Sequence, residues 1–239
     1  MDEQAISEML EMLSDAAQQR KMSKQVNCLR GIRGTPLSEV ARIGAAIQAE
    51  TPPSLPEDED ALTRLFGTAW EDGLVAIGLL AALVPEHPAD VFEIGQEWLT
   101  RVDDVQTADA LGWLVLGPSA LATGRSLAPE GRPEQRRAVA AMALSMIPLT
   151  LEGPSAAPLR QRLDLKAVQF VLAPVTEPLG ALLTSVVKDS DPGVRKVIRR
   201  VLRAWTKADP GAVVAWAETI RGGLPRLLQD EVNKARRKA

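Results

Sequence analysis

The stretch DPGVRKVIRRVLRAW, residues 191–205, carries the pattern that decides the fold. Its proline follows an aspartate and stands at a first helical position, where the missing N–H costs nothing. Apolar residues then recur every three or four positions, which places them on one helix face. The stretch GRPEQRRAVAAMAL, residues 131–144, repeats the pattern, with Pro133 matching Pro192. The other matched pairs are Arg136 with Arg195 and Arg137 with Lys196.

Helical spacing extends along most of the chain. Thr35 is the expected N-cap of one helix, and Ile6 to Ala17 is expected to form a single amphipathic helix. A loop is expected over residues 151–164, which contain Gly153 and two prolines. No window alternates as a half-buried strand does, so a sheet of three or more strands would contradict the prediction. Further helices are predicted near residues 36–49, 70–84, 107–116, 133–147, 192–208 and 210–221.

The repetition predicts how these helices pack. Each helix pair leaves an apolar face that only the next pair can cover, so several pairs must stack. An Asp-Pro-x-Val-Arg opening, as at Asp191–Arg195, is typical of HEAT repeats. We therefore expect one all-α domain over residues 1–239, a HEAT-like helical repeat solenoid (α-α superhelix). Its antiparallel helix pairs would form one curved layer, and we expect a monomer.

Composition narrows the classes of function. A single cysteine, Cys28, and a single histidine, His87, cannot build a zinc site, and no Gly-rich phosphate loop or nucleophile motif is present. We expect neither a metal nor a cofactor. The longest apolar run, residues 74–84, is too short to span a bilayer, and the opening Met-Asp-Glu lacks the basic start of a signal peptide. A cytoplasmic protein without membrane contact is therefore expected.

Charge is distributed unevenly along the chain. Residues 1–100 carry 7 Lys/Arg against 17 Asp/Glu, a balance of −10, whereas residues 193–239 carry 12 against 4, a balance of +8. A basic segment on an otherwise acidic protein is a possible binding surface for phosphate groups. We therefore expect the helices of residues 192–239 to bind double-stranded DNA. The alternatives are a solvated helix face and arginines that only bond the neighbouring repeat. The candidate DNA-binding residues are Arg136, Arg137, Arg195, Lys196, Arg199, Arg200 and Arg203.

Four segments in order resemble a known family, the bacterial HEAT-like-repeat DNA alkylation-repair glycosylases of the AlkD type. They are GIRGTPLSEVARI (31–43), VQTADALGWLVLG (105–117), QRRAVAAMAL (135–144) and VRKVIRRVLRAWTKADPGAV (194–213). The resemblance implies excision of positively charged methylated purines from duplex DNA held in a basic concave cleft. In the family, a carboxylate and two tryptophans face the deoxyribose.

The family pattern transfers to this chain at some positions only. Asp109 falls at the catalytic aspartate, and Arg137 falls at an arginine that contacts DNA phosphate. The two tryptophan positions hold Val105 and Arg200 instead. Trp113, one helical turn after Asp109, is a candidate replacement for a lost aromatic wall.

The implied chemistry explains these residue types. Charge moves onto the sugar as the glycosidic bond breaks, and an ionised carboxylate stabilises the oxocarbenium ion. We expect the Asp109 carboxylate to point into the groove, so that Asp109→Asn lowers excision by about 10²-fold. Two alternatives remain: a non-catalytic relative that recognises DNA structure, and a protein-interaction scaffold. The lesion, the DNA structure and any partner of the acidic half stay open.

Overall fold

The described parts of the chain fold into helices joined by turns and loops. The computed structural model describes residues 1–147 and 176–239, and within these two ranges no strand occurs. The prediction of an all-α fold is thereby confirmed. The expected loop at residues 151–164 lies outside the described residues. The helices are α1 (Glu3–Met12), α2 (Ala16–Ser23), α3 (Leu37–Glu50), α4 (Glu59–Thr68), α5 (Trp70–Ala82), α6 (Pro88–Leu99), α7 (Val105–Ala110), the π-helix η1 (Leu111–Leu116), α8 (Gly117–Thr123), α9 (Pro133–Met142), α11 (Thr176–Val186), α12 (Pro192–Ala208), α13 (Pro210–Thr219) and α14 (Arg226–Arg236).

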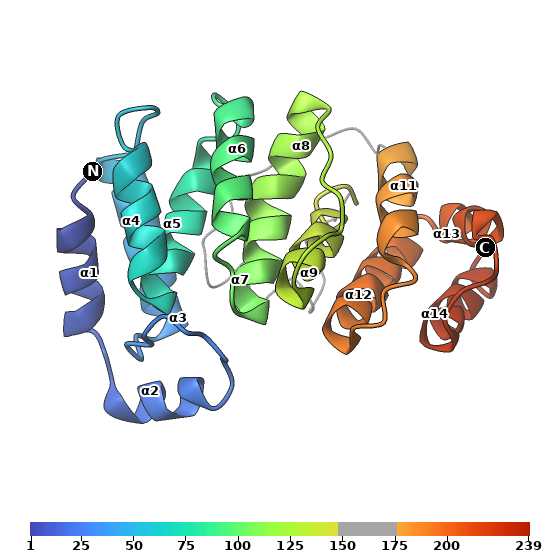
Figure 1. The fold of residues 1–239 in the computed structure, drawn as a ribbon, viewed down its shortest axis with the longest axis horizontal. Coiled ribbons are helices and arrows are strands. Elements are labelled where there is room, and N and C mark those ends of the chain that lie inside the picture. Colours follow the sequence, from blue (N-terminus) through green and yellow to red (C-terminus); the bar gives the residue numbers. More distant parts are fainter. Residues whose placement is uncertain (148–175) are drawn as a thin grey trace.

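The helices follow one another in chain order along the longest axis of the molecule, from α1 at one end to α13 and α14 at the other (Figure 1). Neighbours along this axis are in contact: α4 packs on α5, α5 on η1, η1 on α9, α9 on α12, and α12 on α14. Each helix thus covers the apolar face that its predecessor leaves. This order is what stacked helix pairs require, and the HEAT-like solenoid class remains our prediction for it.

The proline-led helix starts form as expected. The Asp191 carboxylate accepts a hydrogen bond from the Val194 N–H at 3.0 Å, directly before Pro192 opens α12. The Asp209 carboxylate does the same for the Ala212 N–H at 2.8 Å at the start of α13. Each carboxylate satisfies an N–H that has no partner inside its helix. The two starts therefore have one physical cause.

Two details of the N-terminal helices differ from expectation. Thr35 does not cap α3, because its hydroxyl donates to the Leu10 carbonyl at 2.7 Å and ties α3 to α1 instead. The predicted helix from Ile6 to Ala17 is also interrupted, since α1 ends at Met12 and α2 begins at Ala16. The Asp15 carboxylate accepts a hydrogen bond from the Gln18 N–H at 2.7 Å and caps a new helix. The cap therefore interrupts the helix that the apolar periodicity had predicted.

Buried acids hold the segment before α3. Glu71 accepts hydrogen bonds from the N–H groups of Arg33 at 3.1 Å and Gly34 at 2.8 Å. Asp72 accepts from the Arg33 guanidinium at 2.7 Å. Gly34 has a φ of 89°, a backbone conformation that favours glycine. Part of the acidic excess of the first hundred residues thus stabilises the fold itself.

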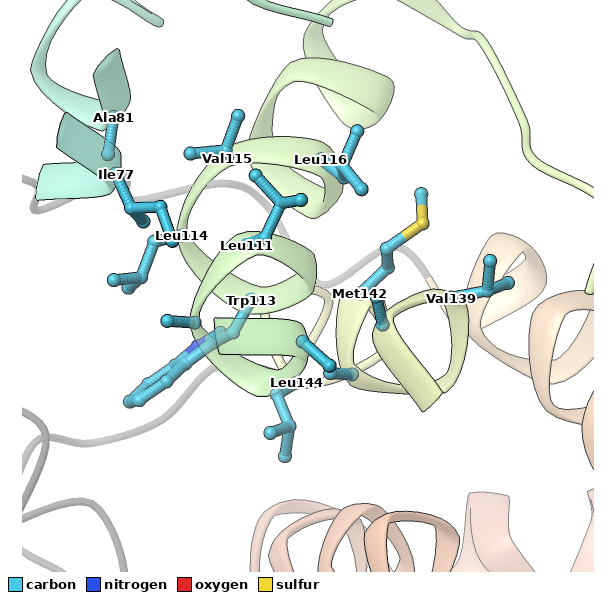
Figure 2. Close-up of a cluster of buried hydrophobic side chains, with 14 of the residues drawn as sticks. Ile77, Ala81, Leu111, Trp113, Leu114, Val115, Leu116, Val139, Met142 and Leu144 are labelled. Atoms are coloured by element: carbon cyan, nitrogen blue, oxygen red, sulfur yellow. The ribbon is translucent and has the colours of Figure 1, made fainter. Parts of the chain in front are cut away.

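The core around η1 is aliphatic. Figure 2 shows η1 between α5 and α9, with Leu114 and Val115 directed towards Ile77 and Ala81 of α5. On the other side η1 packs so closely on α9 that a Cβ on Gly112 would lie 2.1 Å from the Ala138 carbonyl oxygen. Only glycine permits this approach. Within the described part of the chain, no helix is long and apolar enough to cross a membrane.

Candidate nucleic-acid interface

Asp109 and Arg137 form a buried ion pair between α7 and α9. The Arg137 Nε and Nη2 atoms donate to the two carboxylate oxygens of Asp109 at 2.7 and 2.8 Å. The third nitrogen, Nη1, donates to the Gly193 carbonyl at 3.0 Å. Asp109 and Arg137 are each 8% exposed. Arg137 thereby connects α7, α9 and the first turn of α12.

The local sequence positions this pair. Asp104 caps α7 by accepting from the N–H groups of Gln106 and Thr107 at 2.8 and 2.9 Å. The following segment continues as the π-helix η1, a rare element that often occurs at functional sites. Because Gly112 lets η1 approach α9 closely, Asp109 reaches the Arg137 guanidinium.

Arg200 of α12 reaches the same place. Its Nη1 lies 3.6 Å from an Asp109 oxygen, and its guanidinium carbon lies 5.9 Å from the centroid of the Trp113 ring. Arg200 therefore lies beside both Asp109 and Trp113. We refer to Asp109, Trp113, Arg137 and Arg200 as the Asp109 corner.

The geometry of the corner differs from the expected one in two respects. We expected the Asp109 carboxylate to point into the groove, yet Arg137 holds both of its oxygens. We also expected Arg137 on the DNA-facing surface, yet it is buried between helices. A bidentate pair is the strongest arrangement that these two side chains can form, and packing of α9 on α7 enforces it. Val105, at the first expected tryptophan position, opens α7 and is 42% exposed.

Several predicted DNA-binding arginines bond neighbouring elements. Arg136 Nε donates to the Asp189 carboxylate at 2.6 Å, and Arg195 Nε donates to the Asp189 carbonyl at 2.7 Å. Arg136 and Arg195 thus both contact the turn between α11 and α12, and DNA binding by these two residues stays a prediction. Arg199 and Arg203 both contact Glu231 of α14, at 3.1 and 2.9 Å. Sequence reasoning missed Glu231 because the pairing depends on how α14 packs on α12.

Glu231 is a buried acid with three cationic partners. Its side chain is 2% exposed, and Lys234 approaches it at 3.2 Å in addition to the two arginines. Burial alone would raise the pKa of Glu231, but hydrogen bonds from Arg203, Lys234 and Arg199 outweigh it and lower the pKa to about 2. The Glu231 carboxylate thus contacts three cationic side chains at the junction of α12 and α14.

Around this junction lies a basic face. On α12 the basic residues from Arg195 to Lys207 fall within an arc of about 140° at 100° per residue. Lys196 and Lys207 are exposed, with no ion pair to any residue that the structure describes. Arg203 and Lys234 keep 55% of their side chains exposed beside Glu231. We define the basic face as Lys196, Arg200, Arg203, Lys207 and Lys234.

Acidic features occupy the other half of the molecule. A groove of about 570 Å³ between α4 and α6 is lined by His87 and four acidic residues, Glu59, Asp90, Glu93 and Glu97. His87 Nδ1 lies 3.6 Å from the Asp90 carboxylate. A phosphate backbone would be repelled from this groove.

A second acidic group surrounds the only cysteine. Cys28, Asp103 and Asp104 bring their potential ligand atoms within 4.8 Å of one another, a grouping that sequence reasoning did not find. The Arg30 guanidinium lies 3.5 Å from Asp103 and 3.3 Å from Asp104, so it compensates the two carboxylates. Burial is the main cause that raises the pKa of the Cys28 thiol to about 11.

The fold and this face together define an all-helical protein with a basic C-terminal end and an acidic N-terminal half. A family model described as DNA alkylation repair enzyme matches residues 6–234, nearly the whole chain. No curated protein matches the chain closely enough to be compared with it. The chain belongs to the DNA alkylation repair enzyme family, as its sequence suggested. Membership in this family supports a role in DNA repair.

Proposed function

We propose that this protein binds duplex DNA through the basic face as part of alkylation repair, and that it recognises the DNA without excising a base. The basic face is the observation that carries the proposal: five cationic side chains on two adjacent helices, four of them exposed. Cations in this arrangement neutralise phosphates and release counterions from DNA. The acidic groove between α4 and α6 leaves the C-terminal end as the place for this contact.

The arrangement of Asp109 argues for recognition rather than excision. A carboxylate stabilises an oxocarbenium ion when its charge is aimed at the sugar and is not already compensated. The Asp109 charge is compensated by Arg137, which holds both oxygens at 2.7 and 2.8 Å. Asp109 accordingly acts in this proposal as the anchor that fixes Arg137 and Arg200 beside the basic face.

Slow excision of N-alkylated purines is the second candidate. It is favoured by one observation: Asp109 lies beside Trp113 and keeps 11% of its side chain exposed. A labile cationic base is already a good leaving group and needs little assistance. Incubation of methylated duplex with the protein, followed by heating in alkali, counts the abasic sites produced. Abasic sites above background that vanish in Asp109→Asn, with the variant verified as folded by circular dichroism, would establish excision and overturn the non-catalytic assignment.

Salt dependence tests the binding proposal. Log affinity for an unmodified duplex should fall against log salt with a slope of about −0.9 per phosphate contact. Lys196→Gln and Lys207→Gln should each weaken binding and reduce the slope by about 1. Lys21→Gln, which removes an exposed cation of α2 far from the basic face, is the matched control and should leave both quantities unchanged. Affinity that ignores salt between roughly 50 and 200 mM would favour a protein-interaction scaffold.

A further inference from the structure

Arg200 occupies the one position of the Asp109 corner where a cation meets both a carboxylate and an aromatic face. Its guanidinium lies 3.6 Å from an Asp109 oxygen and 5.9 Å from the Trp113 ring centroid. A cation within about 6 Å of an indole face is attracted by the ring quadrupole. The corner therefore contains a carboxylate and an aromatic ring, the two groups that bind an organic cation. The Arg200 guanidinium occupies the position that such a cation would take.

We propose that Arg200 is a specificity-determining residue: it acts as a built-in cation that excludes cationic, N-alkylated bases from the corner. The inference rests on the proposed DNA-binding function and deepens it by naming what the interface rejects. The lesion or structure bound by the wild-type chain would be one whose base carries no positive charge.

Two observations support this assignment. Arg137 already compensates Asp109, so an incoming cationic base meets no unbalanced negative charge. Arg200 covers the Trp113 face, so the base must displace it or forgo cation–π attraction. Because Arg200 also belongs to the basic face, the residue that attracts the DNA backbone is the one that repels a cationic base.

Removal of the built-in cation should change selectivity rather than folding. In Arg200→Gln, Asp109 keeps its bidentate partner Arg137, so the α7–α9 junction stays intact. The variant should bind unmodified duplex less tightly, because one phosphate contact is lost. Its preference for a duplex with 7-methylguanine over the unmodified duplex should rise on the order of tenfold, as expected for the loss of a like charge at contact distance near a protein surface.

Two matched variants separate charge from position. Lys196→Gln removes an equal charge one turn earlier on the same helix, and should weaken binding to both duplexes equally. Arg200→Lys keeps the charge in place and should retain the wild-type preference. Fluorescence anisotropy with the two duplexes at one salt concentration gives the ratio of affinities for every variant, and thermal unfolding verifies that each variant is folded.

Binding of a small organic cation tests the proposed cation site without DNA. Quenching of indole fluorescence by 1-methylnicotinamide, compared with uncharged nicotinamide, should increase in Arg200→Gln but not in Lys196→Gln. An unchanged duplex preference in folded Arg200→Gln, or equal quenching by the cation in wild type and Arg200→Gln, would overturn the inference. If no variant binds duplex, the proposed function fails, while the quenching comparison still decides whether Arg200 fills a cation site.

Discussion

Asp109 and Arg137 bury opposite charges against each other, which makes the pair a determinant of stability whatever its part in function. Loss of one partner leaves the other buried and uncompensated, at a cost of about 3–5 kcal/mol. The Gly193 carbonyl and the remaining amide oxygen of an asparagine would still accept hydrogen bonds from Arg137. We therefore expect Asp109→Asn to lower the free energy of unfolding in urea by about 2–4 kcal/mol.

Glu97→Gln is the control for this measurement. It removes an ion pair with Arg101 in which both side chains are about half exposed. Exposed pairs contribute less than about 1 kcal/mol. If both variants lost the same free energy of unfolding, the Asp109–Arg137 pair would not act as a buried electrostatic contact. The Asp109 carboxylate would then be available for another role.

Glu231 gives the C-terminal helices a dependence on acid. Because its pKa is lowered to about 2 in the folded chain, its contribution to stability is fully present above the unfolded value near 4.5 and is lost as the pH falls through 2. The stability difference between wild type and Glu231→Gln should therefore shrink between pH 5 and pH 2. Urea unfolding at several pH values measures it. Glu218→Gln, at an exposed position of α13, is the control for removing one acidic side chain from the C-terminal helices.

At the scale of elements, the sequence predicts helix starts better than helix geometry. The range of α12 was predicted to the residue, because Asp191 and Pro192 fix its first turn and the apolar stripe runs without interruption. Residues 107–116 were predicted as one α-helix, whereas the structure has α7 followed by η1. Six residues are too few for periodicity to distinguish a π-helix from an α-helix. In the folded chain η1 packs on α5 and α9, contacts that the sequence of the segment alone does not reveal.

Gly112 makes the contact between η1 and α9 possible. An alanine Cβ would lie 2.1 Å from the Ala138 carbonyl oxygen, and a backbone atom cannot yield as a flexible side chain does. We expect Gly112→Ala to lower the free energy of unfolding by about 3 kcal/mol or more, since the helices must separate. Calorimetry or urea unfolding measures the change.

Gly44→Ala is the matched control inside another helix. No atom lies within 4 Å of the Cβ that it would add to α3, so the higher helix propensity of alanine should leave stability unchanged or raise it by up to about 1 kcal/mol. A neutral Gly112→Ala would mean that η1 does not depend on this close approach.

For the whole molecule, the separation of charge predicts a short DNA footprint. The 17 residues of α12 span about 25 Å, the length of roughly seven base pairs. Affinity should rise steeply with duplex length up to about ten base pairs. For longer duplexes the affinity should grow only with the number of overlapping binding sites on the DNA. Anisotropy titrations with duplexes of increasing length test this. A steep rise that continues to twice that length would indicate that the acidic half also contacts the DNA.

The candidate site was predictable in its parts but not in its connections. The basic composition of α12 and the separation of Asp109 from Trp113 by four residues are visible in the sequence itself. The partners did not, because Asp109 meets Arg137 across 28 residues and Arg136 meets Asp189 across 53. Such distances are set by how helices stack. Consequently the sequence identified which side chains are charged near the site, and the structure identified which of those charges are already balanced.

The π-helix lets the chain carry one additional residue beside the corner without turning Asp109 away from Arg137. Within η1, each turn holds about one residue more than an α-helical turn. A chain that lost one residue between Leu111 and Leu116 could continue as an ordinary α-helix with its hydrogen bonds complete. The helices before and after the deletion would keep nearly the same relative orientation, because the wider turn of η1 absorbs the extra residue. A single-codon deletion that removes a residue of η1 other than Trp113 should therefore leave Asp109 directed towards Arg137, whereas the same deletion inside an ordinary α-helix would turn one end of it by about 100°.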